Sequence, residues 1–140
     1  KHKSFGAVGT PELKPAISEN DLHSLIELGC VYEDVKIGNK TFLMRTLNAS
    51  EKLYLAKSAV EDQTAEGLFN LNVKVLAISI QKVNGKSLEE FLPNEKDTLQ
   101  AKCEIISQFQ SPVINRLLEF YNEIATRGDA QFTVQQIKNS

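Results

Sequence analysis

The sequence predicts an α+β domain that is mostly α, and two observations support this. Residues 31–47 form two extended runs joined by Gly38 and Asn39, and such a pair between β-rich runs is typical of a short hairpin turn. Most of the chain after residue 47 carries apolar residues at helical spacing. We therefore expect an N-terminal arm and short helix, a β-hairpin over about 31–47, and then a bundle of about four helices.

Three segments are expected along the 140 residues: an extended arm over 1–17, a single α+β domain over 18–128, and a C-terminal tail over 129–140. The arm contains Pro11 and Pro15, which disfavour helix. Its isolated apolar side chains could anchor it on a partner or on the domain, and a mobile terminus is the alternative. These side chains are Phe5, Val8 and Leu13.

A short helix is predicted over about residues 19–28. Ser18 and Asp21 form a weak capping box, and Gly29 supplies a C-terminal stop. The apolar residues that recur on one face are Leu22, Leu25 and Ile26.

The hairpin that follows must bury one of its faces. Phe42 and Met44 lie on the opposite face of the second strand from Arg45 and Leu47. Because an isolated two-stranded hairpin is marginal in water, either the helices cover it or another chain pairs with its edge.

After the hairpin, Asn48 and Glu51 bracket a capping-box-like start, and the helix is expected to run to about Glu61. The apolar residues at helical spacing are Leu53, Ala56 and Val60.

Residues 68–83 follow Gly67 and are apolar on almost every side, which predicts a buried central helix. Their β-branched residues leave a strand as an alternative, but the length favours a helix, because strands usually run roughly 3–10 residues. Asn84 and Gly85 are expected to stop this helix, since both tolerate the left-handed backbone of helix ends.

Two further helices are predicted. Asn94 can cap the first, while Ser111 with Pro112 begins the second, and Arg127 with Gly128 is expected to close it. The inner stripe of the first is Leu99, Cys103 and Ile106. The inner face of the second is Val113, Leu117, Phe120 or Tyr121, and Ile124.

The apolar stripe of this last helix is doubled at 113/114 and at 117/118, so it is wider than one packing seam needs. That width suggests a second buried face supplied by another subunit or by a bound helix. Ordinary burial in a compact bundle is the alternative.

Composition excludes some partners. The formal charge is -2, so no basic excess exists to neutralise phosphates and nucleic acid is not expected. The longest apolar stretch, around 73–80, is far shorter than the roughly 20 residues of a membrane span, so no membrane partner is expected. Cys30 and Cys103 have no neighbouring cysteine and are expected to be reduced, packed thiols, with a disulfide between them as the alternative.

No residue pattern names a catalytic chemistry. His2 and His23 have no histidine or cysteine at metal-ligand spacing, and the sequence has neither a GxSxG elbow nor a glycine-rich phosphate loop. We therefore expect no catalytic residue, no cofactor and no metal. A small enzyme is a further alternative, and it would need a cluster of distant residues such as His23, Arg45 and Glu51.

Four stretches carry a family resemblance: the hairpin VKIGNKTFLMRTL, the transition RTLNASEKLYLAKSA, the segment VNGKSLEEFL and the aromatic-rich helix LLEFYNEI. In this order, the block over residues 35–92 with the helical pair that follows resembles tail assembly chaperones and related baseplate-hub assembly proteins of tailed bacteriophages. The positions that match are Arg45, Leu47, Leu53, Phe91 and Leu92. The resemblance implies a non-enzymatic protein that engages tape-measure or hub proteins and keeps their apolar helices soluble until tube and baseplate polymerise.

The expected function is therefore phage tail or baseplate morphogenesis in the host cytoplasm, by contact with tape-measure, hub or tube proteins. The alternative is a permanent structural subunit of the virion baseplate or neck, and a homo-oligomer is a further option. The expected partner-binding residues are Phe5, Val8, Leu13, Phe42, Met44, Val113, Leu117, Phe120, Tyr121 and Ile124.

Overall fold

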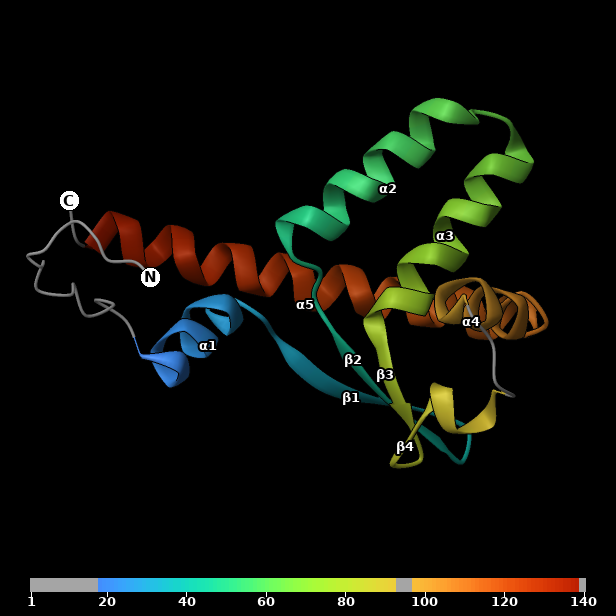
Figure 1. Cartoon of the computed structure of the whole chain (residues 1–140), viewed down its shortest axis with the longest axis horizontal. Helices are drawn as coiled ribbons and strands as arrows, with labels where there is room; N and C mark the ends of the chain where they lie inside the picture. The colour runs from blue at the N-terminus through green and yellow to red at the C-terminus, as the bar shows by residue number, and fades with distance from the viewer. Residues whose placement is uncertain (1–17, 93–96, 139–140) are drawn as a thin grey trace, which may run out of the picture.

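The computed structural model describes residues 18–92 and 97–138, with side chains described up to residue 130. The fold is α+β and mostly helical, as predicted, with a small four-stranded antiparallel sheet (Figure 1). Its elements are α1 Glu19–Glu27, β1 Tyr32–Ile37, β2 Lys40–Arg45, α2 Ala49–Glu61, α3 Ala65–Ser79, β3 Ile80–Val83, β4 Lys86–Ser87, the 3-10 helix η1 Leu88–Phe91, α4 Thr98–Ile106 and α5 Ser111–Lys138.

The predicted hairpin is confirmed as β1 and β2. Ile37 pairs with Lys40 at its closed end, so Gly38 and Asn39 form a two-residue turn. Gly38 has a φ of 62°, which glycine adopts without the steric cost that other residues meet.

The sheet contains two strands more than the hairpin, in the order β1-β2-β3-β4. The helix predicted over residues 68–83 ends at Ser79, and the last four residues form β3 against β2. Asn84 and Gly85 therefore do not stop a helix. They have φ values of 53° and 82° and turn β3 into β4, because the same left-handed backbone serves a hairpin turn as well as a helix end.

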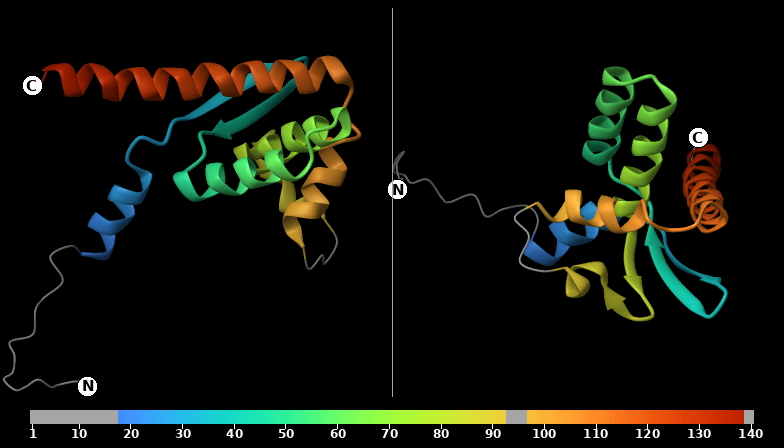
Figure 2. Two further views of the ribbon diagram at one scale, coloured as in Figure 1. Left: turned by 90° about the horizontal axis from the view of Figure 1, so that it is seen from above. Right: turned by 90° about the vertical axis from the view of Figure 1, so that its right-hand side faces the viewer.

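The core lies between one face of the sheet and three helices. Figure 1 and Figure 2 show α5 lying along β1 and β2, while α2 and α3 form an antiparallel pair that projects from the rest of the molecule. The fully buried large side chains come from β2, α3, β3, α4 and α5: Met44, Leu76, Ile80, Ile106, Leu117 and Ile124.

The expected end of the last helix at Gly128 is wrong, because α5 continues to Lys138. Gly128 lies at a close approach between α5 and the chain leading into β1. A Cβ added there would lie 3.3 Å from Cγ2 of Val31. This glycine therefore allows α5 to pack closely on the segment before β1 and does not end the helix.

Four α-helix starts in the described part of the chain follow local side-chain chemistry. Thr64 caps α3 by accepting from the backbone N–H of Gly67. Ser18 caps α1, and Asn48 with Glu51 forms the predicted capping box of α2. Asp97 caps α4, while the expected cap Asn94 lies outside the described residues.

Candidate protein-interaction surfaces

Five of the predicted partner-binding residues lie in the protein's own core and are not exposed to a partner: Phe42, Met44, Leu117, Phe120 and Ile124. Val113 and Tyr121 are half-buried and pack against the same core. The wide stripe of α5 is used within the chain, because the helix meets the sheet on one side and α3 on another. The remaining three, Phe5, Val8 and Leu13, lie outside the described residues.

The large apolar side chains that do face solvent lie mainly on three other helices, which the sequence did not single out as surfaces. The first is the α1 surface, which we define as Leu22, Leu25 and Ile26. These side chains are 51–62% exposed, and none of the nine residues of α1, all within the described part of the chain, is buried. Amphipathic spacing predicted the helix, but it did not show that the apolar face would remain uncovered.

The second is the α2 surface, which we define as Leu53, Ala56 and Val60. Leu53 is 56% and Val60 is 72% exposed. The α2 residue that is buried is Leu55. The apolar residues whose spacing predicted the helix therefore form its solvent-facing side.

Contacts between α2 and α3 explain this orientation. Lys74 of α3 donates to the Ser58 hydroxyl at 3.2 Å, and its ammonium lies 5.4 Å from the centre of the Tyr54 ring. These polar and cation–π contacts hold the Tyr54 and Ser58 side of α2 against α3. The apolar stripe is consequently left on the outside.

The third is the α3 surface, which we define as Leu68 and Phe69. Both follow the first turn of α3, near the loop that joins the projecting pair (Figure 1). They are 59% and 43% exposed. Their neighbour Gly67 is buried against Asp62, so the backbone that presents them is closely packed.

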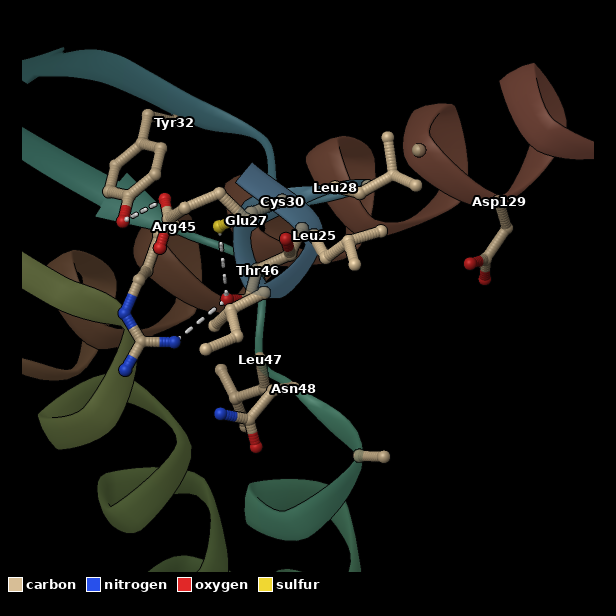
Figure 3. A pocket seen from close by; sticks show the side chains of 14 residues that line it. Leu25, Glu27, Leu28, Cys30, Tyr32, Arg45, Thr46, Leu47, Asn48 and Asp129 are labelled. Carbon is tan, nitrogen blue, oxygen red and sulfur yellow. Dashed lines mark hydrogen bonds between the residues drawn. The ribbon is translucent and has the colours of Figure 1, made fainter. Parts of the chain in front are cut away.

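A pocket of about 800 Å³ lies between α1, the end of β2 and α5 (Figure 3). Leu25 and Leu28 contribute apolar surface, while Tyr32, Arg45 and Asp129 contribute polar groups. The pocket is open to solvent, and it lies between the C-terminal end of α1 and the rest of the domain.

Polar groups in this pocket bond to one another. The Tyr32 hydroxyl donates to Glu27 at 3.1 Å. Partial burial, and then this bond to a carboxylate, raise the pKa of Tyr32 to about 12. The thiol of Cys30 lies 3.9 Å from the carbonyl oxygen of Thr46.

As predicted, Cys30 and Cys103 are both free thiols. Burial raises the pKa of Cys103.

An ion pair at the end of β2 fixes the start of α2. Arg45 donates to both carboxylate oxygens of Glu51, at 2.9 and 2.7 Å. Glu51 also accepts from the backbone N–H of Asn48 at 2.9 Å. The bond from Arg45 is the main reason that the pKa of Glu51 lies below its ordinary value.

The three residues considered for an enzyme are only partly brought together. Arg45 and Glu51 are in contact, and their charged atoms make the bonds that orient α2. His23 is exposed on α1 and does not line the pocket beside it. In the described ranges, no group of three or more His, Cys, Asp or Glu residues is placed to hold a metal ion. No helix in those ranges combines the length and the apolar character that crossing a bilayer requires.

Comparisons with models of protein families, with curated proteins and with solved structures found no match to this chain.

Proposed function

We propose that this protein is a non-enzymatic assembly factor of a bacteriophage tail or baseplate, which binds tape-measure or hub proteins through exposed apolar helix surface. One observation supports the binding role: large apolar side chains are exposed to solvent on three helices, and they are not part of the buried core. Single exposed apolar residues are common, whereas several grouped on one helix face are typical of protein-binding surfaces. The phage setting rests on the resemblance of residues 35–92.

The α3 surface is best placed for a partner. Leu68 and Phe69 lie near the end of the projecting pair, so a helix or loop of another protein reaches them without displacing the core. An aromatic beside an aliphatic residue is a suitable anchor for the apolar face of a helix. Such contacts would shield a tape-measure helix from aggregation while the tube is still incomplete.

Co-expression with the tape-measure or hub protein of the same phage tests this proposal. We expect a complex that co-elutes in gel filtration. The double substitution Leu68→Ser with Phe69→Ser should weaken it more than about tenfold, because anchors of this type dominate interface energies. Glu66→Ser, at an exposed polar position of the same helix, is the matched control and should leave the complex intact. Two folded proteins that never co-elute would contradict the proposal.

Mass spectrometry of purified particles separates the assembly factor from the alternative of a permanent subunit. An assembly factor should be absent from mature particles. Presence in fixed stoichiometry would instead assign the protein to the baseplate or neck.

A further inference from the structure

The α1 surface has acidic residues on both sides. Leu22, Leu25 and Ile26 stand at positions i, i+3 and i+4, which share one face of a helix. At 3.6 residues per turn, Asp21 falls on one side of this stripe and Glu19 on the other. Residues 18–30 contain no lysine or arginine. The surface is thus an apolar stripe between carboxylates.

The α2 surface has the opposite charge pattern. Leu53, Ala56 and Val60 stand at positions i, i+3 and i+7. On the same helical geometry, Lys52 falls on one side of the stripe and Lys57 on the other. The two lysines and the two larger apolar residues of the stripe are all exposed: Lys52, Lys57, Leu53 and Val60. This surface is an apolar stripe between ammonium groups.

The two surfaces are complementary in polarity and in charge, and neither covers the other within one chain. Both stripes remain more than half exposed at their large aliphatic residues. We propose that copies of this protein associate head to tail, with the α1 surface of one copy docked on the α2 surface of the next. This association does not depend on the phage partner proposed above.

Charge determines the arrangement. Docking of α1 on a second α1 would bring carboxylates together, and docking of α2 on a second α2 would bring lysines together, so symmetric pairing is disfavoured. A head-to-tail contact leaves one free α1 surface and one free α2 surface at the ends, and it extends into a ring or an open chain. Because α1 is only about 13 Å long at 1.5 Å per residue, the interface is small and the association weak.

Sedimentation of the full chain over a range of concentrations tests the proposal. We expect a concentration-dependent increase in mass that weakens severalfold at high salt, where the flanking charges are screened. Leu25→Ser with Ile26→Ser disables the α1 surface, and Leu53→Ser with Val60→Ser disables the α2 surface. Each double variant should reduce the association constant by more than about tenfold. These positions are exposed, so the variants should fold, and circular dichroism checks this.

Mixing the two double variants gives the decisive result. One retains an intact α2 surface and the other an intact α1 surface, so the mixture should form one-to-one dimers and no larger species. Leu68→Ser with Phe69→Ser is the matched control: it should self-associate as the unsubstituted chain does, even if it loses a phage partner. The proposal is overturned if the chain stays monomeric, if the mixture fails to pair, or if the substitutions change only the compactness of a monomer, which would place α1 on α2 of the same chain.

Discussion

At the scale of single residues, Glu51 links two elements. Its carboxylate receives two bonds from Arg45 of β2 and one from the backbone of Asn48 at the start of α2. Both side chains of the ion pair are largely shielded, at 19% and 24% exposure. The same group therefore caps a helix and fixes that helix to the sheet, which exposed ion pairs rarely do.

Replacing Glu51 by Gln should lower the free energy of unfolding by about 2 kcal/mol, within the range for hydrogen bonds to charged groups. Urea denaturation at neutral pH measures this. Glu119→Gln is the control, because it removes an exposed pair with Arg116, and it should cost at most about 0.5 kcal/mol. Equal losses in both variants would contradict the role assigned to Glu51.

The stabilisation by Glu51 should depend on pH with a definite sign. Its pKa is lowered in the folded protein from an ordinary value of 4.5, chiefly by the bond from Arg45. Its contribution is therefore complete above pH 4.5 and is lost as pH falls through the lowered value. The difference in unfolding free energy between the unsubstituted chain and Glu51→Gln should shrink as the pH falls below 4.5. A constant difference over this range would count against the ion pair as its source.

At the scale of elements, the close approach of α3 to the end of α2 restricts which residue can stand at position 67. Gly67 lies in the first turn of α3, where an added Cβ would overlap the backbone oxygen and the side chain of Asp62. Asp62 cannot move freely, since its carboxylate accepts a 3.1 Å bond from the backbone of Thr64. The close turn thus requires glycine for space rather than for a positive φ.

Gly67→Ala should destabilise the protein by about 1–3 kcal/mol, the usual cost of overpacking, although alanine is the better helix former. Glu66→Ala, one residue earlier in the same turn and exposed, should change stability by less than about 1 kcal/mol. Thermal unfolding followed by circular dichroism compares them. A stabilised Gly67→Ala variant would show that the α2–α3 turn relaxes easily.

At the scale of the whole molecule, the core does not depend on α1. The buried cluster is drawn from β1, β2, α3, β3, η1, α4 and α5. The base of α1 meets this body at the open pocket, where the bond of Tyr32 to Glu27 is exposed. Stability and the proposed self-association are therefore separable properties of the chain.

A chain shortened to residues 29–140 should keep its cooperative unfolding and lose no more than about 1 kcal/mol, because no apolar side chain of α1 is buried. Ile106→Ala provides the contrast: this fully buried residue should cost about 2–5 kcal/mol. Loss of a cooperative transition in the shortened chain would show that residues 1–28 contribute to the folding unit.

Local chemistry was sufficient for much of the secondary structure. Ser18, Asn48 and Gly38 each act within a few residues, through a cap or a two-residue turn, so the sequence by itself determined α1, the hairpin and the start of α2. Apolar spacing likewise determined that α2 and α5 are amphipathic helices.

Only the tertiary structure decided how those elements are used. Spacing defines a stripe but not which segment packs against it. The α2 stripe therefore faces solvent, while three of the five α5 residues expected at a partner are in the core and the other two pack against it. Asn84–Gly85 turns a hairpin because Met44 of β2 offers Ile80 a pairing partner far away in sequence. Gly128, expected to end α5, instead lies inside the helix where it closely approaches Val31. Each of these outcomes depends on contacts between distant segments, which form only when the whole chain packs.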